Sequence, residues 1–489
     1  MEWLVGGALL AWFLATVMLV RLEYYDGLDS ILNARYFTGQ IDGFTATRGP
    51  LVGLLLTPAE WIRQAFALHP LEFRPHHAIM ALVHGLFLFG SYALLTRRFG
   101  RTPASLFAFI AAVPTYIVFS YMPFVSHDLF PGVLLLAMVV ATGNWCERGT
   151  LSRWWTLVAL GAAAALTKHL YGIFWIALLL AFLPRLRDRT AWRPFAGLAL
   201  AAMASGAITW LVLCACLGEV FPNAPWWQRA FEQLHYLSGP AHDQSRSEPW
   251  WVYLRNLPAF GITAVLLVPA GLWLSLRGAP DQRLAARMWL ILLVAMHFID
   301  LRQVRYLAFL GPLTAFLIIP AVERLGRRKV ALAAAVALLA LEFLPIHSYS
   351  RMTESLRFAS RFYRAEVIRE FLSPAEQSRG VLRTPVYINW TMLSFTPPWP
   401  TPLAGDIYHN LFHVGYHHLY YLYALGPGEL VMLDQEGLAA LDPTATTGTL
   451  IHASGGILIH RTRWGERGTD NAISLMQTVI PLPANPPHP

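Results

Sequence analysis

The sequence is poor in charged residues. Asp, Glu, Lys and Arg make up 13% of the 489 residues, whereas a typical soluble domain is about 25% charged. Hydrophobic residues make up 56%, and the mean hydropathy is +0.45. Apolar stretches long enough to cross a hydrocarbon core of about 30 Å recur as far as position 346. This composition excludes an ordinary soluble protein and predicts a polytopic membrane protein.

Cysteine and lysine are scarce as well. The three cysteines, Cys146, Cys214 and Cys216, provide neither a disulfide framework nor a zinc-binding spacing. The two lysines are Lys168 and Lys329, so arginine supplies nearly all of the 37 basic residues. The short basic loops contain no P-loop and no Rossmann glycine pattern. A nucleotide-sugar domain is therefore excluded there, and no nucleic-acid partner is expected.

We expect about eleven transmembrane helices, with an α-helical fold over residues 1–346. The first, from Trp3 to Val20, is expected to be retained, because no small-residue cleavage site precedes it. Two short spans between 154 and 184 meet at Lys168. The expected spans are 3–20, 77–95, 103–121, 129–145, 154–167, 170–184, 195–217, 258–276, 288–299, 306–322 and 330–346.

The arginines predict the orientation. Sixteen basic residues gather in alternate short loops, such as 97–101, 185–193 and 324–329. Loops rich in Lys and Arg remain in the cytoplasm, so the N-terminus is expected inside and the C-terminus outside. We expect a bacterial inner (plasma) membrane protein with long outer loops at 21–76 and 218–257, and a periplasmic domain at 347–489.

Several segments outside the spans have recognisable patterns. Residues 51–68 are apolar but contain Pro58, Glu60 and Arg63, which favours a helix lying along the membrane surface. The C-terminal domain is expected to be mixed α/β. It has helical patterns at 353–372 and 407–425 and an alternating pattern at 449–461, typical of a hairpin.

Two carboxylates follow the first span. Asp26 and Asp29 are three residues apart and share a face if the segment is helical. A carboxylate at the membrane surface can act as a general base toward an acceptor hydroxyl. The alternative is structural, with Asp26 capping a helix that begins near Gly27 and Asp29 exposed to solvent.

Histidines suggest two metal-binding candidates. His127 and Asp128 lie in a tight turn between two spans, where they form a metal-ligand pair or, alternatively, a helix cap or a group that orients a donor. His409, His413 and His417 recur every four residues, which places three imidazoles on one face of a helix. An aromatic interfacial surface is the simpler explanation there. A divalent metal (Mg²⁺, Mn²⁺ or Zn²⁺) is the one cofactor considered.

Cations lie close to the outer ends of spans. Lys168 lies where two short spans meet, and Arg302, Arg305 and Tyr306 follow the span at 288–299. Ionisable groups at membrane depth are costly and usually functional. These cations suit the phosphate of a lipid-linked donor, whose leaving-group charge needs stabilisation. The alternative is snorkelling toward lipid headgroups.

These patches, in this order, resemble the GT-C superfamily of integral-membrane glycosyltransferases, which use polyprenyl-phosphate sugars and include mannosyltransferases. The resemblance covers roughly residues 1–346. It implies a catalytic aspartate in the first outer loop, at Asp26 or else Asp29, and a lipid-phosphate site at Lys168 and Arg305. Many relatives have adjacent Asp-Glu in that loop, whereas this chain has Asp26-Gly27. The segments that carry the resemblance are Asp26 with Ala34-Arg35, Gly39 and Arg48-Gly49-Pro50-Leu51; Asp128; Ala165-Leu166-Thr167-Lys168; Pro249–Pro258; and Arg305-Tyr306-Leu307 with Pro312.

The resulting hypothesis is an inverting transfer of one sugar (hexosyl or pentosyl) from a polyprenyl-phosphate donor to a hydroxyl on a glycan, protein or lipid.

Three alternatives to this hypothesis remain. A transporter or lipid flippase predicts charges in mid-span and broken helices. A non-catalytic cell-envelope assembly protein predicts no loss of function on replacing Asp26. A ligase that moves a whole lipid-linked glycan predicts more cations, because its donor is a diphosphate.

Overall fold

The computed structural model describes most of the helical region and part of the C-terminal region. The described residues are 6–7, 11, 25–40, 44, 48–68, 73–115, 118, 125–218, 220–238, 251–255, 260–298, 304–342 and five strands between 421 and 478. Contacts divide the chain into two units. The first contains residues 1–14, 46–55 and 79–355, and the second contains 15–45, 56–78 and 356–489.

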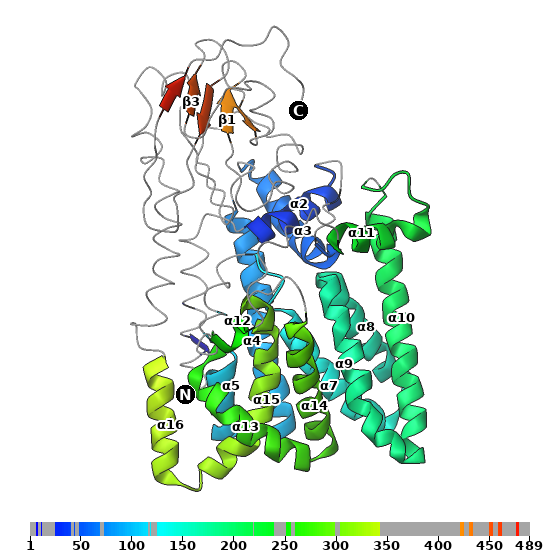
Figure 1. Ribbon diagram of the computed structural model, residues 1–489, viewed down its shortest axis with the longest axis vertical. Coiled ribbons are helices and arrows are strands. Elements are labelled where there is room, and N and C mark those ends of the chain that lie inside the picture. The colour runs from blue at the N-terminus through cyan, green and yellow to red at the C-terminus, as the bar shows by residue number, and fades with distance from the viewer. Residues whose placement is uncertain are drawn as a thin grey trace. The chain divides into compact units, whose positions relative to one another are not determined.

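The first unit is built from helices that run side by side (Figure 1). Two helices are divided between the units: α3 (Pro50–Ala65) begins in the first unit and ends in the second, and α4 (Arg74–Phe99) begins in the second unit and continues into the first. The other helices of the first unit are α5 (Pro103–Ala112), α7 (Pro131–Arg148), α8 (Leu151–Thr167), α9 (Ile173–Phe182), α10 (Trp192–Cys216), α11 (Arg229–Ser238), α12 (Val252–Arg255), α13 (Ile262–Arg277), α14 (Pro280–His297), α15 (Gly311–Leu325) and α16 (Lys329–Glu342). Short 3₁₀ segments are η1 (His169–Gly172), η2 (Leu183–Arg187), η3 (Arg189–Ala191), η4 (Trp226–Gln228) and η7 (Val304–Leu310).

The chain is an integral membrane protein. Four helical segments of the described part are long and apolar enough to cross a bilayer: Arg74–Phe99, His169–Arg187, Arg189–Cys216 and Arg305–Leu325. Helices coincide with each expected span from 77–95 onward, with shifted ends. α5 ends at Ala112, well before the expected 121, and α14 begins eight residues before the expected 288. Because several of these helices are shorter than a full crossing, the number eleven stays a prediction.

Helix ends follow from local sequence. At the start of α5, the Thr102 hydroxyl accepts a hydrogen bond from the Ser105 amide at 3.1 Å, and Pro103 occupies the first turn. This is a typical N-cap, in which the proline has no amide hydrogen to leave unpaired. At the end of α7, Gly149 adopts a left-handed conformation with φ 56°, which a glycine tolerates without steric cost. Helix α7 therefore ends at Arg148, and α8 begins two residues after Gly149.

Helix α15 forms the core of the first unit. The most apolar part of its span is 83% buried inside the protein, against 33 to 39% for the other three. It packs against α5, α7, α13 and α14. On α13, a Cβ at Gly271 would lie 2.7 Å from the Leu317 carbonyl oxygen of α15. The glycine therefore lets the two helix backbones approach closely, as small residues do in membrane helix pairs.

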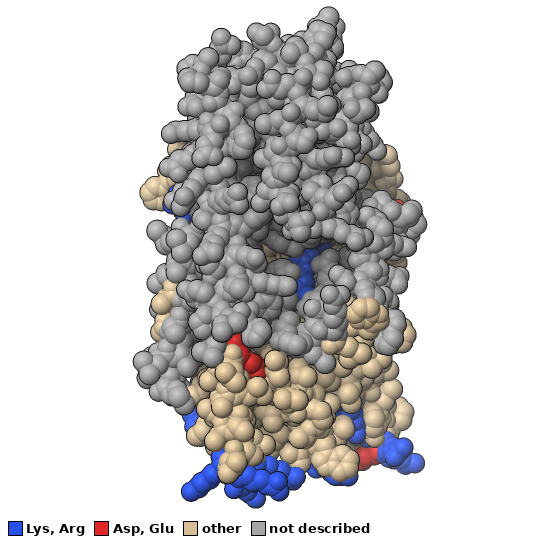
Figure 2. All heavy atoms as spheres, turned by 60° about the vertical axis from the view of Figure 1, so that its left-hand side comes forward, with Lys and Arg blue, Asp and Glu red and all other residues tan. Residues whose placement is uncertain are grey.

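Many exposed basic side chains of this unit gather at one end. Figure 2 shows Lys and Arg at the lower end of the helical body. Arg98, Arg277 and Arg324 lie in the last turns of α4, α13 and α15. The helix ends that lead into these basic loops thus lie at the same end of the unit, as the alternation of basic and less basic loops predicts. That this end faces the cytoplasm stays a prediction from the positive-inside rule.

Within the second unit, the C-terminal region contributes five short strands: β1 (Tyr421–Ala424), β2 (Leu430–Leu433), β3 (Thr449–His452), β4 (Leu458–Arg461) and β5 (Met476–Thr478). Their order is β2-β1-β4-β3-β5, and only β3 and β5 are parallel. The β3–β4 pair, with Ile451 opposite Ile459, confirms the hairpin expected at 449–461. Whether the region forms a separate mixed α/β domain stays a prediction.

The helix expected at 407–425 is wrong over its last residues. Residues 421–424 form β1, which pairs with β2 and β4. The segment Tyr421-Leu422-Tyr423-Ala424 is rich in aromatic residues, which favour strands when neighbouring strands are available. Those pairing partners lie up to 40 positions further along the chain, so the local helical pattern did not reveal them. The helix expected at 353–372 and residues 407–420 lie outside the described residues.

Candidate functional site

A break between two helices places Lys168. Helix α8 ends at Thr167, and Lys168 then adopts an extended backbone, with φ −159° and ψ 128°. The chain turns again at once in η1, where the Tyr171 amide donates to the Lys168 carbonyl at 2.9 Å. This confirms the expected meeting of two short helical segments at Lys168. Because the backbone leaves the helix here, the lysine and Tyr171 both reach the same buried carboxylate.

That carboxylate is Asp128, in the turn that precedes α7. The Asp128 amide donates to the Ser126 hydroxyl at 3.3 Å, which shapes the turn. The Lys168 Nζ lies 3.2 Å from Asp128 Oδ1, and the Tyr171 hydroxyl donates to the same oxygen at 3.0 Å. On the other side, the Arg305 Nε lies 3.4 Å from Asp128 Oδ2. Three segments distant in sequence therefore meet at one side chain.

Tyr306 completes this group, which we call the Asp128 cluster: Asp128, Lys168, Tyr171, Arg305 and Tyr306. The Lys168 Nζ lies 3.9 Å from the centre of the Tyr306 ring, and the Arg305 Cζ lies 5.5 Å from it. Cations at this distance are attracted by the negative face of an aromatic ring. The Tyr306 ring thus stabilises the Lys168 and Arg305 side chains without neutralising their positive charge.

The Asp128 cluster is buried and carries excess positive charge. Asp128 is 1% exposed, Lys168 6% and Arg305 4%. Two cations surround one carboxylate, so the group has a formal net charge of +1 when the tyrosines are neutral. Buried charges are tolerated when they are paired and hydrogen-bonded. An anion that reaches this group would be attracted by the cation in excess.

The segment that precedes α3 reaches the same helix end. A Cβ at Gly49 would lie 2.0 Å from the Leu166 carbonyl oxygen and 2.8 Å from that of Thr167. No side chain fits there, so only glycine allows the loop to pack against the end of α8. The Arg48-Gly49-Pro50 segment is thereby fixed beside the residue that precedes Lys168.

Comparisons with known proteins identify the fold. No protein-family model matches the chain, and no curated protein matches it by sequence. Among solved structures, ArnT from Cupriavidus metallidurans in the apo state has 17% identity and a TM-score of 0.52, and the match covers 76% of this chain and 80% of that one. The same protein bound to undecaprenyl phosphate has 16% identity and a TM-score of 0.52, with 76% and 81% covered.

The chain has the GT-C fold. The resemblance drawn from the sequence is thereby confirmed at the level of the fold. An Archaeoglobus fulgidus oligosaccharyltransferase in the apo form is also similar, with 14% identity and a TM-score of 0.48; the match covers 76% of this chain and 59% of that one.

Within this GT-C fold, the structure brings three of the four predicted phosphate-binding residues together. Lys168, Arg305 and Tyr306 all belong to the Asp128 cluster, while Arg302 lies outside the described residues. The sequence did not predict that Tyr171 and Asp128 meet Lys168 and Arg305 in one group. For Tyr171, its position three residues after Lys168 indicated that the two side chains could lie on the same turn.

The metal candidates remain predictions. The His127 Nε2 lies 4.0 Å from Asp128 Oδ1, but two cations and a tyrosine hydroxyl already surround that carboxylate. Within the part of the chain that the structure describes, no three His, Cys, Asp or Glu side chains are arranged to hold a metal ion. The three histidines at 409, 413 and 417 lie outside the described residues.

The predicted bases lie on α2 (Tyr25–Phe37) in the second unit. Asp26 is in its first turn, in agreement with a helical arrangement of Asp26 and Asp29. Asp29 is fully buried, so the alternative in which it is exposed to solvent is wrong. Ile31, Leu32 and Asn33, which follow on α2, are buried as well. The roles of both carboxylates stay predictions.

A buried ion cluster anchors α2 to α3 in the second unit. Glu60, on α3, is fully buried and accepts from the Arg35 Nε at 2.8 Å and the Arg63 Nε at 2.6 Å. The His76 Nε2 lies 2.8 Å from the same carboxylate, and the Gln40 amide donates to it at 3.0 Å. The helix expected at 51–68 is confirmed as α3. Its charged residues form this cluster, which holds Arg35 in the last turn of α2, at the opposite end of that helix from Asp26.

The pKa of Glu60 reflects these contacts. Burial is the largest single effect and by itself would raise the pKa of Glu60. The hydrogen bond with His76 and the charges of Arg35, His76 and Arg63 together outweigh burial. They lower the pKa well below the usual value for glutamate. Because the pKa is lowered on folding, the carboxylate stabilises the fold above about pH 4.3. This contribution is lost as the pH falls toward the pKa of the folded state.

Replacing Glu60 by glutamine is therefore expected to lower the free energy of unfolding by about 1 to 3 kcal/mol at pH 7, because charge-assisted hydrogen bonds are lost. Thermal unfolding of the detergent-solubilised protein measures the difference. The difference should narrow below pH 4, by at most about 1.4 kcal/mol per pH unit. Glu323→Gln, at an exposed position of α15, is the matched control. A difference that does not change with pH would contradict the assigned pKa.

Proposed function

We propose that the protein is an inverting glycosyltransferase that moves a single sugar from a polyprenyl-phosphate donor to an acceptor hydroxyl on the extracytoplasmic face. The Asp128 cluster, which lies inside a GT-C fold, is the observation that carries the proposal. It offers a lysine and an arginine next to each other, both buried and both partly neutralised by one carboxylate. A phosphate monoester or diester is an anion of the size and charge that such a pair binds.

The similarity to ArnT supports the choice of donor. One ArnT structure contains undecaprenyl phosphate, which is the product that remains after a sugar leaves a polyprenyl-phosphate donor. At 16% identity the similarity itself concerns the fold. Together with the predicted phosphate residues that meet in the Asp128 cluster, it makes a lipid-linked monophosphate the donor class we favour for this chain.

The proposed step is a single displacement. The acceptor hydroxyl oxygen attacks the anomeric carbon, the bond from that carbon to the phosphate oxygen breaks, and its electron pair remains on the polyprenyl phosphate. The hydroxyl proton passes to a carboxylate, which we propose to be Asp26 or else Asp29. Attack opposite the leaving group inverts the anomeric centre. Lys168 and Arg305 stabilise the charge that develops on the phosphate.

The proposed step does not place a metal at Asp128. The Asp128 carboxylate is shared by Lys168, Arg305 and Tyr171, and two cations beside it oppose a divalent ion at the same oxygens. The described residues therefore do not fit a metal at Asp128. The cation pair performs the charge stabilisation that a metal ion would otherwise supply.

The test is release of polyprenyl phosphate. Purified protein is incubated with a panel of polyprenyl-phosphate sugars and possible acceptors, and the freed polyprenyl phosphate is quantified. Release from one donor would support the proposal and name the sugar. If no donor is cleaved and none binds, the proposal is wrong, and the transporter and assembly alternatives gain weight. Binding without release would call for a wider set of acceptors.

The two lysines of the chain provide a matched pair of variants for this assay. Lys168→Ala is expected to raise the KM for the donor about 10- to 100-fold, because a charge-assisted contact to phosphate is lost. The KM for the acceptor should change little. Lys329→Ala removes the same charge at an exposed position of α16 and should leave both values unchanged. An equal effect of the two variants would contradict a phosphate-binding role for Lys168.

A further inference from the structure

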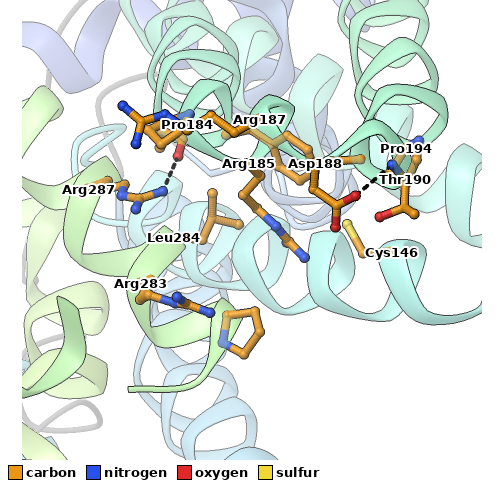
Figure 3. A pocket seen from close by; sticks show the side chains of 14 residues that line it. Cys146, Pro184, Arg185, Arg187, Asp188, Thr190, Pro194, Arg283, Leu284 and Arg287 are labelled. Atoms are coloured by element: carbon orange, nitrogen blue, oxygen red, sulfur yellow. Dashed lines mark hydrogen bonds between the residues drawn. The ribbon is translucent and has the colours of Figure 1, made fainter. Parts of the chain in front are cut away.

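A second concentration of positive charge lies in a pocket at the basic end of the first unit. The pocket has a volume of about 540 Å³, within the usual range for small-molecule sites. It lies between the η2–η3 segment, which joins α9 to α10, and the first turns of α14 (Figure 3). Four arginines line it, and we call it the arginine pocket: Arg185, Arg187, Arg283 and Arg287, with Asp188 and the apolar Ala181, Phe182 and Leu284 among the other lining residues.

The four arginines come from two segments about a hundred residues apart. Arg185 and Arg283 extend from opposite sides toward the middle of the pocket in Figure 3. Arg185 is half-buried, and its Cζ lies 4.9 Å from the centre of the Phe182 ring. Arg287 is half-buried too, and its Nη1 donates to the Ala181 carbonyl at 3.3 Å. Two of the guanidinium groups are therefore held in place by contacts with the pocket wall.

The acids among the lining residues do not balance this charge. Asp188 is the one acid among the lining residues, and it is exposed and accepts from the Thr190 amide at 2.9 Å. Asp281, at the start of α14, accepts from Arg98 through both oxygens, one of them at 3.0 Å. The formal charge of the lining is therefore +3. Like charges this close repel one another unless an anion lies between them.

The positive-inside rule explains why these loops contain arginine. It does not explain why four arginines from two loops line one cavity, since a topogenic charge is equally effective when it points into solvent. The pocket also has an apolar wall, formed in part by Phe182 and Leu284. Charged groups on one side and apolar surface on the other suit an anionic ester better than a bare inorganic ion.

We propose that the arginine pocket is a binding site for a phosphate-bearing anion, separate from the Asp128 cluster. The phosphate lies between Arg185 and Arg283 and accepts hydrogen bonds from their guanidinium groups, while the ester portion contacts Phe182 and Leu284. Two sources supply this chemistry: the headgroup of an anionic phospholipid, or a soluble phosphate ester. The site is independent of the proposed glycosyltransferase activity, and its test uses binding alone.

The experiment measures ligand-dependent thermal stability of the full-length protein in a neutral detergent. Phosphatidylglycerol, zwitterionic phosphatidylcholine and inorganic phosphate are titrated separately. We expect saturable stabilisation by phosphatidylglycerol and none by phosphatidylcholine at the same concentration. Stabilisation by inorganic phosphate at similar concentrations would assign the site to a soluble ester instead. If none of the three probes binds, the proposal is overturned.

A charge-matched pair of variants locates the binding. Arg187→Gln/Arg283→Gln removes the two exposed arginines of the pocket, and Arg327→Gln/Arg328→Gln removes two exposed arginines elsewhere at the basic end. The pocket variant is expected to weaken phosphatidylglycerol binding about tenfold or more, since a charge-assisted hydrogen bond to phosphate is lost. The control variant should bind normally. Equal weakening in the two variants would show non-specific attraction to the basic end and would overturn the proposal.

Both pairs consist of exposed side chains, so the variants are expected to fold. Their melting temperatures without added lipid check this directly. If the pocket variant is itself less stable, the single variants Arg187→Gln and Arg283→Gln replace it. Arg283→Gln removes one of the two proposed phosphate contacts and should then weaken binding relative to Arg327→Gln, and normal binding by Arg283→Gln would contradict the site.

Discussion

Asp128→Asn is expected to lower the free energy of unfolding by about 3 to 5 kcal/mol, because it leaves two buried cations without their carboxylate. Lys168 and Arg305 are 6% and 4% exposed, so water cannot replace the lost charge without rearrangement. Asparagine can still accept the hydrogen bond from Tyr171, so the loss reports mainly on charge. Thermal unfolding in detergent measures the effect, and the apparent melting temperature should fall by several degrees.

Two comparisons make this expectation specific to charge. Asp281→Asn breaks the ion pair with Arg98, whose side chain is 40% exposed, and exposed pairs contribute about 1 kcal/mol or less. It should therefore have a small effect. Adding Lys168→Met to Asp128→Asn removes one of the unpaired cations and should restore part of the stability. If the double variant is as unstable as the sum of the single ones, the two residues are not coupled.

The same variant tests whether the cations bind phosphate. Without Asp128, the two cations have lost their anion, so undecaprenyl phosphate should stabilise Asp128→Asn more than it stabilises the wild type. Ligand stabilisation depends on the ratio of ligand concentration to Kd, and the comparison is made at one concentration. An equal or smaller shift in the variant would contradict phosphate binding at this pair and leave the cluster a structural role.

The local features of the site were predictable from sequence. The meeting of two short apolar segments at Thr167-Lys168-His169 predicted a break, and the structure places the lysine in extended backbone there. Lys168 and Arg305 are predictable site residues because ionisable residues near membrane depth are costly. What a single sequence does not reveal is that both reach Asp128, which lies 40 residues before Lys168. Helices can pack in many arrangements, and only the folded chain selects one.

The Glu60 cluster illustrates the same limit. In the sequence, Pro58, Glu60 and Arg63 within an apolar segment favour a helix lying along the membrane surface. The structure instead buries Glu60 with Arg35 and His76, which belong to other helices. A charged residue on an apolar helix indicates either a solvated face or a buried partner. The sequence pattern alone does not choose between them, because the partners are distant in sequence.

Asp26→Asn is expected to lower the rate of sugar transfer by about 10²- to 10⁴-fold, which is the usual contribution of a general base. Asparagine has the same shape but cannot accept the acceptor's proton. Asp26 lies in the first turn of α2, and asparagine is favoured at helix N-termini about as strongly as aspartate, so the free energy of unfolding should change little. Transfer is measured as acceptor-dependent release of polyprenyl phosphate, and donor binding should remain at the wild-type level.

Asp29→Asn is the matched variant, one helical turn further along α2. Because Asp29 is fully buried, the variant should lower thermal stability, while transfer per folded molecule should fall much less than in Asp26→Asn. The opposite result, in which Asp29→Asn folds normally but has lost transfer and Asp26→Asn is active, would assign the base to Asp29. If both variants retain transfer, neither carboxylate takes the proton, and the base must be sought outside α2. Since the Lys168 comparison depends on the donor alone, the phosphate site would stand even then.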